Sequence, residues 1–437
     1  MLPKEIDFVL GTLEDAGYGA YIVGGCVRDG LLGREVSDYD VTTSATPEEV
    51  ERVFEGHRVI ETGIKHGTVT VLSGEYPVEI TTFRRDGEYR DGRHPESVTF
   101  TTSIGDDLSR RDFTVNSMAC DRRGNVVDPF GGKSDAERGV IRCTGDAEKR
   151  FGEDALRIIR ALRFSSVLGF EIEENTAAAI HEMKDSLLSI SAERVFSELK
   201  KLLCGRDVYR VLRDYSDVVC TLIPEMTPAV GFDQMSKYHC FDVYTHIIKS
   251  VEAIDPDPTL RLAMLFHDIG KPYACTEEEP GVRHFRGHGE ISERIARERL
   301  AALRADNETV RLVTLFCKIH DRPIVPERRP VRRVLSAITF DEFLMLCKIK
   351  RADNAAQAPE YRERAKTVDE IEQIGRKIVR DNECFSLRDL AVDGGDLSAL
   401  GLRGKQIGDA LKEVLSLVID EKLPNEKEEI IKYIKGH

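Results

Sequence analysis

Hydrophobic residues near the start of the chain change from a helical to an extended spacing. Between residues 6 and 13 the apolar positions recur three and four residues apart, which predicts an amphipathic helix. Glycines interrupt this pattern, and the apolar run at residues 20–23 is typical of a strand. Further short runs occur at residues 68–72, 78–83 and 98–101, separated by turn-forming and charged residues. The first part of the chain, up to about residue 140, is therefore predicted to form a small mixed sheet with helices.

Beyond that point the spacing of apolar residues is helical throughout. The longest periodic stretches predict helices at residues 154–165, 192–203, 258–266, 291–303 and 408–419. The acidic segment with Pro and Gly at residues 276–281 is predicted to be a surface loop. The chain contains no internal repeat or low-complexity tract. This order of elements indicates an α+β fold, a compact α/β head followed by a long all-α remainder.

The composition is that of a globular protein with several modules. The 437 residues are 41% hydrophobic and 32% charged, which are ordinary values for this class. A chain of this length predicts about two to four packed modules. Charged residues at positions 4, 5 and 7 interrupt any N-terminal apolar run, and no apolar stretch of 18 residues follows. We therefore expect no signal peptide, no membrane partner and a cytoplasmic location.

Cysteine spacing and net charge limit the classes of ligand. The ten cysteines include no CxxC pair, which argues against a structural zinc site and a disulfide framework and predicts reduced thiols. A formal net charge of −14 opposes nucleic-acid binding as a whole-molecule average. Arginine clusters at residues 110–111, 157–163 and 328–333 can still form a local basic path on an acidic body.

Candidate chemistry begins directly after the first predicted strand. Two glycines follow that strand, and further on Asp38 and Asp40 flank a single residue. If residues 38–41 form a strand, its two-residue period places both carboxylates on one face, a few ångströms apart. Such a pair suits Mg²⁺ that also binds substrate phosphates. The glycines would let backbone N–H groups approach a triphosphate, and Arg28 would add positive charge. Either feature alone is also common in solvated turns.

The combination of these features resembles the first motif of the polymerase-beta-like nucleotidyltransferases. Within that group the chain is identified as a member of the class II tRNA nucleotidyltransferases and bacterial poly(A) polymerases. Further segments resemble this family in the same order, and the segment at residues 387–404 resembles its tail. They are a flexible loop at residues 82–100, a second motif at 110–119, a third motif at 128–132 and a nucleotide-selecting helix at 153–164.

The segment at residues 153–164 has two chemically different faces. At 100° per residue its charged members spread over one half of a helix, and its apolar members occupy the other half. A carboxylate and a guanidinium group can accept from and donate to the edges of C and A. The resemblance implies this base-selecting role for Asp154 and Arg157. Spacing alone leaves open an exposed helix with Asp–Arg pairing three residues apart.

The resemblance also implies roles for the individual residues of the head. Asp38 and Asp40 are the expected catalytic residues and Mg²⁺ ligands. Glu79 is a candidate third carboxylate of the polymerase-beta type, or equally an outward-facing strand residue. The expected nucleotide-binding residues are Gly24, Gly25, Arg28, Arg111, Asp154, Arg157, Arg160 and Arg163.

A second set of candidate ligands lies in the helical remainder. The string HDIGK at residues 267–271 resembles the HD-domain metal-dependent phosphohydrolases, and bacterial tRNA nucleotidyltransferases exist with and without this module. Imidazole and carboxylate groups together suit a transition metal or a mixed Mg²⁺/Mn²⁺ site. We expect a second divalent metal and a phosphohydrolase activity on cyclic phosphates or phosphorylated 3′ ends; a purely structural body is the alternative. The candidate ligands are His246, His267, Asp268, His288, His320 and Asp321.

The implied function is addition of C, C and A to the 3′ end of tRNA. CTP and ATP would react without a nucleic-acid template, by a two-metal mechanism that releases pyrophosphate. The implied partners are tRNA, ATP and CTP. The implied domains are a catalytic head at residues 1–140, a helical neck at 141–205, an HD-like body at 206–335 and a tRNA-binding tail at 336–437.

Several other functions use parts of the same pattern. An A-only or CC-only adding enzyme and a poly(A) polymerase share the motifs, although the full-length segment at residues 84–95 favours complete addition, because CC-only relatives tend to shorten it. Sugar-nucleotide transferases also use an Asp-x-Asp pair, but the arginine-rich helix and the RRDFT string argue against them. A phosphohydrolase with an RNA-binding head is the rival from a different class.

Overall fold

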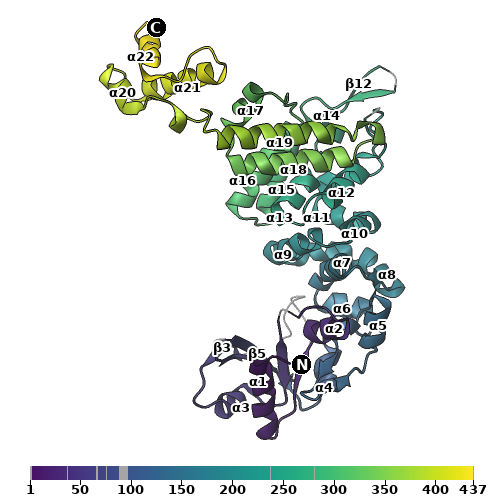
Figure 1. Ribbon diagram of the computed structural model, residues 1–437. Helices are drawn as coiled ribbons and strands as arrows, with labels where there is room; N and C mark the ends of the chain where they lie inside the picture. Colours follow the sequence, from purple (N-terminus) through teal and green to yellow (C-terminus); the bar gives the residue numbers. More distant parts are fainter. Residues whose placement is uncertain are drawn as a thin grey trace. The chain divides into compact units, whose positions relative to one another are not determined.

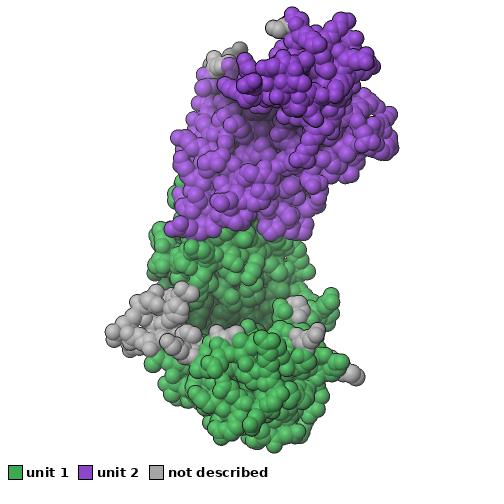
Figure 2. All heavy atoms as spheres, turned by 90° about the vertical axis from the view of Figure 1, so that its left-hand side faces the viewer, with its two compact units in different colours: residues 1–227 green, residues 228–437 purple. Residues whose placement is uncertain are grey.

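The computed structural model describes residues 2–36, 38–64, 67–74, 76–87, 97–236, 238–279 and 281–436. They form two compact units, Met1–Thr227 (unit 1) and Pro228–His437 (unit 2), which have different colours in Figure 2. All ten cysteines are free thiols. Among the described helices, none combines the length and the apolar character needed to cross a membrane.

A seven-stranded mixed sheet forms the head of unit 1 (Figure 1). Its strands are β1 (Ala20–Val23), β2 (Asp40–Thr43), β3 (Val59–Gly63), β4 (Thr68–Ser73), β5 (Tyr76–Thr82), β8 (Ala119–Cys120) and β9 (Val126–Val127). They lie in the order β3-β4-β5-β2-β1-β8-β9, and only β2 and β5 run parallel. Helix α1 (Lys4–Asp15) packs Ile6 and Leu10 into the same core as Val41 and Ile80, which stand in register on β2 and β5. The predicted mixed sheet is confirmed.

The predicted strand at residues 98–101 belongs to a separate two-stranded sheet. β7 (Val98–Phe100) pairs antiparallel with β6 (Arg84–Asp86). Residues 88–96 of the expected flexible loop lie outside the described residues. The other helical elements of the head are α2 (Gly25–Leu31), α3 (Pro47–Val53), α4 (Ile104–Ser109), η2 (Thr114–Asn116) and α5 (Gly132–Arg138).

The remainder of unit 1 is almost entirely helical. The predicted helix at residues 154–165 is wrong at its start, because α6 (Ala147–Glu153) ends just before it and α7 (Leu156–Leu168) begins only at Leu156. Asp154 between them is extended, with φ −145° and ψ 102°, and its Oδ1 accepts a hydrogen bond from the backbone N of Leu156. A short polar side chain that bonds the backbone locally competes with helix formation. The other elements are β10 (Val140–Ile141), β11 (Glu171–Ile172), α8 (Glu174–Met183), η3 (Lys184–Ser189), α9 (Ala192–Leu203), α10 (Val208–Asp214) and α11 (Ser216–Leu222).

Unit 2 is a helical body that also contains a hairpin. Figure 1 shows α18 and α19 side by side. The helices at the predicted residues 258–266, 291–303 and 408–419 are confirmed, although two of them begin three residues early. The helical elements are η4 (Pro224–Ala229), which begins in unit 1, α12 (Val243–Ala253), α13 (Pro258–Phe266), α14 (Lys271–Ala274), α15 (His288–Ala302), α16 (Asn307–Ile319), α17 (Arg328–Leu335), α18 (Phe340–Ala355), η5 (Pro359–Tyr361), α19 (Arg364–Arg380), η6 (Leu387–Asp389), α20 (Gly394–Ala399), α21 (Lys405–Ile419) and α22 (Lys427–Gly436).

Two charged segments of unit 2 differ from the sequence interpretation. The predicted surface loop at residues 276–281 is wrong, since β12 (Thr276–Glu279) pairs antiparallel with β13 (Val282–His284). Glu277 stands opposite Arg283, and pairing of opposite charges across strands stabilises such a hairpin. The arginines of α17 form ion pairs with acidic residues of unit 2, so carboxylates offset the charge of this cluster. Those acidic residues are Asp381, Glu383, Asp420 and Glu421.

Candidate functional sites

A strand-turn-helix segment builds one edge of the first site. β1 ends at Val23 and α2 begins at Gly25, so the chain turns at Gly24 with a φ of 79°. This left-handed region favours glycine, and an added Cβ would lie 3.4 Å from the Nη1 atom of Arg111. Val23 is the antiparallel partner of Asp40. The turn therefore brings open backbone next to the start of β2.

Acidic residues gather at the start of β2. Asp40 is the first residue of this strand, whereas Asp38 precedes it, so the expected strand at residues 38–41 is wrong for its first two residues. The pKa of Asp40 is raised, mainly because burial removes water from its carboxylate. The positive charge of Arg111 lowers this pKa in part, and the negative charge of Asp38 raises it further. Glu79 stands in register with Asp40 on the parallel strand β5 and is exposed. The charges of Asp38 and Asp40 act on each other, and carboxylate oxygens are ligands that Mg²⁺ prefers.

Asp40 lines a cavity of about 410 Å³, which we call the nucleotide cavity because the residues expected to bind nucleotide line it. This volume is in the usual range for small-molecule and cofactor sites, about 300–1,000 Å³. All eight residues that the sequence predicted to bind nucleotide line it, together with Asp40. The structure thus brings together three segments that are far apart in the sequence. Four further lining residues were not predicted: Arg110, Asp112, Asn116 and Phe164.

Each of the five predicted arginines is held by a carboxylate of unit 1. The paired atoms are 2.5 to 3.2 Å apart. Charge-assisted pairs of this kind hold guanidinium groups in fixed positions, which reduces the entropy lost when a ligand binds. The pairs are Arg28–Asp29, Arg111–Asp107, Arg157–Glu153, Arg160–Asp112 and Arg163–Glu198.

Asp112 connects the second motif to helix α7. Its Oδ2 accepts from Nε and Nη2 of Arg160 at 3.0 and 2.5 Å, and its Oδ1 accepts from the amide of Asn116 at 3.1 Å. Asn116 in turn accepts from Nη1 of Arg28 at 2.6 Å. Burial alone would raise the pKa of Asp112, but the charge of Arg160 holds it down at about 2. Asp112 and Asn116 therefore fix Arg28 and Arg160 relative to each other. The sequence analysis did not predict roles for Asp112 and Asn116, although both lie in its second motif at residues 110–119.

The expected base-selecting pair, Asp154 and Arg157, is held from outside helix α7. Oδ2 of Asp154 lies 3.1 Å from Nη2 of Arg194 on α9. Arg157 donates to Glu153 at 2.9 Å and to the carbonyl oxygen of Arg110 at 3.0 Å. Among the described residues the two side chains do not pair with each other. The two potential base-contacting groups are thus oriented independently.

Phe164 forms an aromatic wall of the nucleotide cavity. The guanidinium carbons of Arg163, Arg160 and Arg28 lie 3.7, 5.3 and 5.5 Å from the centre of its ring. Cations near an aromatic face are attracted by its quadrupole. The residue completes the EDALRIIRALRF segment, but the sequence analysis used only the charged positions of that segment.

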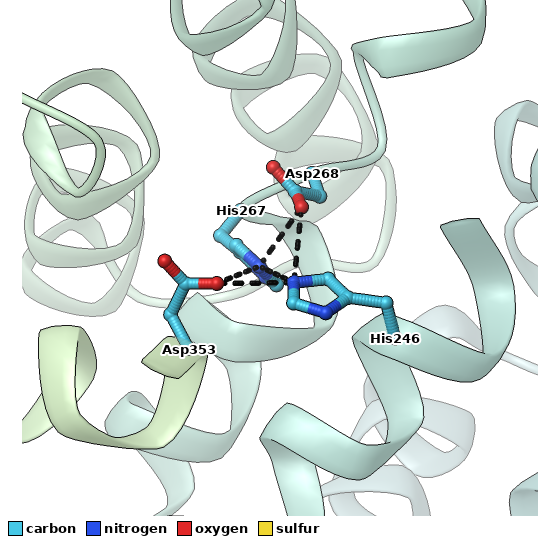
Figure 3. A group of neighbouring side chains, drawn as sticks. All are labelled: His246, His267, Asp268 and Asp353. Carbon is cyan, nitrogen blue, oxygen red and sulfur yellow. Dashed lines mark hydrogen bonds and ion pairs between the residues drawn. The ribbon is translucent and has the colours of Figure 1, made fainter. Parts of the chain in front are cut away.

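Unit 2 brings a second set of side chains together. His246 lies on α12, His267 and Asp268 follow α13 directly, and Asp353 lies near the end of α18 (Figure 3). Nε2 of His246 lies 3.2 Å from Asp268 Oδ2 and 3.0 Å from Asp353 Oδ1. The Nε2 atoms of His246 and His267 are 3.3 Å apart. The four ligand atoms point toward one another, a grouping that could hold a metal ion.

A second group contacts the other side of Asp268. The Nε2 atoms of His288 and His320 lie 3.3 Å apart, and 3.2 and 3.4 Å from Asp268 Oδ1. Asp321, a predicted ligand, is about half exposed and lies 3.8 Å from His288 Nε2, outside both groups. Asp353, which no sequence feature indicated, is present instead. We call the set the histidine centre: His246, His267, Asp268, His288, His320 and Asp353.

A close backbone contact holds the two groups together. An added Cβ at Gly270 would lie 2.4 Å from the carbonyl oxygen of His288, so only glycine fits here. The backbone N of Gly270 donates to Ser292 Oγ at 2.9 Å. Burial alone would raise the pKa of Asp268, but the charges of His267 and Lys271 keep it well below its usual value. The turn after α13 is thereby fixed against α15 with an ionised carboxylate at its tip.

A larger cavity of about 1340 Å³ adjoins the histidine centre. Its lining carboxylates are Asp268, Asp321 and Asp353. Its lining lysines and arginines outnumber them, so the wall favours an anionic ligand. These cations are Lys271, Arg283, Arg286, Lys350 and Arg364.

Comparison with known proteins finds three family models along the chain. The Poly A polymerase head domain matches residues 20–142, which include most of the nucleotide cavity. The probable RNA and SrmB-binding site of polymerase A matches residues 169–218. The tRNA nucleotidyltransferase domain 2 matches residues 287–434.

Relatives and solved structures agree with these models. A CCA-adding enzyme of Oceanobacillus iheyensis is 32% identical over 437 residues, covering 98% of this chain and 95% of that protein. A CCA-adding enzyme of Lactobacillus delbrueckii subsp. bulgaricus is 50% identical over 230 residues, which span 52% of this chain and only 57% of the relative. The crystal structure of the Bacillus stearothermophilus CCA-adding enzyme in complex with CTP is 30% identical, with a TM-score of 0.73 over all of this chain and 98% of that one.

Proposed function

The chain belongs to the family of CCA-adding enzymes, and on that basis we propose that it adds C, C and A to the 3′ end of tRNA. CTP and ATP are the proposed nucleotide substrates, and no nucleic-acid template takes part. The observation that carries the proposal is that all eight expected nucleotide-binding residues, and Asp40, line one cavity. An accidental motif match would not bring these distant segments to one place.

The proposed reaction is a nucleotidyl transfer. The 3′ oxygen of tRNA forms a bond to the α-phosphorus, the bond from that phosphorus to the pyrophosphate oxygen breaks, and the hydroxyl proton is released. Asp38 and Asp40 would hold Mg²⁺, with Glu79 as a third carboxylate beside Asp40 in the register of β2 and β5. When bound, Mg²⁺ supplies positive charge for the attacking and leaving oxygens.

The arginines of the nucleotide cavity would hold the triphosphate and the base. Arg28 and Arg111 lie next to the turn at Gly24 and would contact phosphates, as would open backbone N–H groups of the turn. Arg111 uses Nη2 for Asp107, and its buried Nε has no acceptor among the described residues, so it keeps donor capacity for a ligand. Asp154 and Arg157 would accept from and donate to the base edge in place of a template.

The choice among CCA, CC-only, A-only and poly(A) addition is tested by substrate. Transcripts of tRNA that end before CCA, after C and after CC are incubated with each nucleoside triphosphate alone and together, beside an unrelated RNA. We expect C from the first two, A from the third, and nothing on the unrelated RNA. Asp38→Ala should abolish addition and leave tRNA binding intact; an Asp38→Ala protein that still adds nucleotides would refute the ligand assignment.

Two further assignments complete the proposal. The segments would act as a catalytic head at residues 1–140, a neck at 141–205, a body at 206–335 and a tail at 336–437 that binds tRNA. The proposed location is the cytoplasm, where tRNA and nucleoside triphosphates are both available. Tail binding predicts that a chain with charge-reversed exposed residues of α21 or α22 binds tRNA more weakly while a free nucleotide binds unchanged.

A second activity is proposed for unit 2, a metal-dependent phosphohydrolase. The observation that favours it is the convergence of four imidazoles and two carboxylates beside a cavity with excess cations. Water would add to phosphorus, the P–O bond to the alcohol would break, and the proton from water would end on the alcohol. Hydrolysis of p-nitrophenyl phosphate with Mn²⁺, by an Asp40→Asn protein with and without His267→Ala, tests this activity; absence of metal-dependent hydrolysis in the parent protein refutes it.

A further inference from the structure

Helix α17 carries its arginines on one side and its buried apolar residues on the other. At 100° per residue, the four arginine positions fall within about 140° of one another. Val331 and Leu335 lie outside this sector, are at most 3% exposed and pack in a core with residues of α18 and α19. The arginine side therefore faces away from that core. The arginines are Arg328, Arg329, Arg332 and Arg333.

A second hydrophobic core lies further along the chain, in residues 384–434. It includes Leu397 of α20, Val414 of α21 and Ile430 of α22, and among the described residues it shares no member with the core of α17, α18 and α19. Ion pairs between the arginines of α17 and the segments that follow α19 and α21 join the two cores. We call these contacts the ionic joint, and its carboxylates are Asp381, Glu383, Asp420 and Glu421.

Asp420, the residue after α21, bridges two arginines of the ionic joint. Its Oδ1 lies 3.0 Å from Nε of Arg329 and also contacts Nη2 of Arg333. The two arginine side chains are 51% and 48% exposed, whereas the side chain of Asp420 is only 8% exposed. Arg328, which pairs with Glu383, is 43% exposed. Water screens ion pairs of such partly exposed groups, so an anion from solution can replace the carboxylates at little cost.

Arg332 differs from the other arginines of α17. Its side chain is 9% exposed, and its Nη2 lies 2.5 Å from Oε1 of Glu421. Glu421 has a φ of 59°, in the left-handed region that residues other than glycine rarely adopt. Such a backbone persists only where surrounding contacts hold it, and the pair with Arg332 is one of these contacts. One arginine therefore anchors the ionic joint, while the other three are accessible to solvent.

The accessible arginines suit phosphate as well as they suit carboxylate. The planar guanidinium group binds either anion with two parallel hydrogen bonds. A nucleic acid offers several phosphates in a row, and its binding to arginines releases condensed counterions, which separate carboxylates do not provide. A nucleic-acid backbone is therefore a strong competitor for these side chains.

We propose that α17 is a binding surface for an RNA phosphate backbone, which the carboxylates of the ionic joint cover in the free protein. RNA phosphates and carboxylates compete for Arg328, Arg329 and Arg333, so that binding of RNA opens the joint between the two cores. The pair of Arg332 with Glu421 remains closed. The inference rests on the proposed function only for the identity of the RNA, a tRNA.

Competition predicts that removal of a carboxylate strengthens the binding of RNA. Wild type and Asp420→Asn, each as the whole chain, are titrated against a fluorescent tRNA transcript that ends before CCA, and anisotropy gives the dissociation constant. We expect Asp420→Asn to lower this constant by about fivefold, the effect of one partly exposed ion pair. Asp369→Asn removes the same charge from an exposed pair with Arg351 and should leave the constant unchanged. An unchanged constant in Asp420→Asn, or an equal gain in Asp369→Asn, overturns the proposal.

The arginines are tested in the same titration. A chain with both Arg329→Gln and Arg333→Gln should bind the transcript more weakly than wild type. Addition of Asp420→Asn to that chain should change nothing, because the carboxylate then has no arginine to cover. Thermal unfolding shows that each variant is folded. A gain from Asp420→Asn that persists without both arginines overturns the competition.

Nucleotide addition to the same transcript separates this inference from the proposed function. Addition by the wild type, together with an unchanged dissociation constant in Asp420→Asn, overturns the competition and supports the function. Tighter binding by Asp420→Asn without addition by any of the proteins supports the RNA surface and overturns the function.

Discussion

The nucleotide cavity of unit 1 and the histidine centre of unit 2 present opposite chemistry. Six arginines line the first, each paired with a carboxylate. The second is made of nitrogen and oxygen acceptors, with each imidazole held by a backbone carbonyl. One therefore suits an anion and the other a cation. In both sites, contacts with other protein groups hold the ligand-facing side chains in place: carboxylates hold the arginines, and backbone carbonyl oxygens hold the imidazoles.

The two sites also differ in how they are encoded. The nucleotide cavity is built from three continuous segments, around residues 24–40, 110–116 and 154–164. The histidine centre takes one residue each from helices α12, α15 and α18, one from the position directly after α16, and two from the turn after α13. Local motifs therefore identify the first site well and the second only in part.

The largest expected effect is a complete separation of the two activities. Asp40→Asn should lower nucleotide addition by about 10³-fold or more, because charge stabilisation at the reacting phosphate is lost. The same variant should keep its Mn²⁺-dependent hydrolysis of p-nitrophenyl phosphate. His267→Ala should show the reverse pattern. Loss of both activities in either folded variant would mean that the two sites are not independent.

Removal of Asp112 should cost unit 1 a large part of its stability. Asp112→Ala leaves the partly exposed Arg160 without its partner, so the free energy of unfolding should fall by less than the loss of about 3–5 kcal/mol that follows when a fully buried pair is broken. Urea unfolding of the wild type and the variant measures the difference. Asp7→Asn, which breaks the exposed pair with Arg122, is the matched control and should change the midpoint little. Equal effects of the two substitutions would contradict the role assigned to Asp112.

The same carboxylate predicts a smaller dependence of stability on pH. The pKa of Asp112 is about 2 in the folded chain and about 3.9 in an unfolded one. The ionised carboxylate of Asp112 therefore adds on the order of 2 kcal/mol to the free energy of unfolding above about pH 4, and this contribution is lost as the pH falls toward 2. Urea unfolding of wild type and Asp112→Asn at pH 6 and pH 2.5 should show a difference that shrinks at the lower pH. A difference independent of pH would contradict the ionised state of Asp112.

The smallest expected effect concerns the choice of base. Arg194 orients Asp154 through a partly exposed contact of 3.1 Å, and such pairs contribute about 1 kcal/mol or less. Arg194→Ala should therefore change the ratio of kcat/KM for CTP and ATP by about fivefold or less. Arg213→Ala, at an exposed pair with Asp214 on α10, is the control and should leave the ratio unchanged. An unchanged ratio in Arg194→Ala would show that Asp154 needs no such support.

The sequence predicted the parts of the fold that local patterns determine. Helices α9 and α13 lie where apolar periodicity placed them, because an amphipathic face packs in nearly any helical body. The break at Asp154 was missed, since one side-chain hydrogen bond to the backbone outweighed the helical pattern around it. The hairpin of β12 and β13 was missed because β12 is acidic and its pairing with β13, including Glu277 opposite Arg283, is not visible in the pattern of β12 alone.

The site residues, too, could be predicted only where they lie in local sequence motifs. The eight cavity residues lie in long motifs, so their grouping followed from the order of segments. Asp353 has no motif around it, and it reaches the histidine centre only because α18 packs against α12 and α13. Asp321 is adjacent to His320 in sequence, yet the end of α16 leaves it half exposed. Adjacency in sequence is therefore a poor guide to ligands where helices deliver them one at a time.

The most direct test of the central claim is the length of the product on a natural acceptor. A tRNA transcript that ends before CCA is mixed with excess enzyme, CTP and ATP, and the products are resolved at single-nucleotide resolution. The wild type should add three nucleotides and stop, and Asp40→Asn should add none. Unlimited addition of A, or three nucleotides added by Asp40→Asn at the wild-type rate, would contradict the claim.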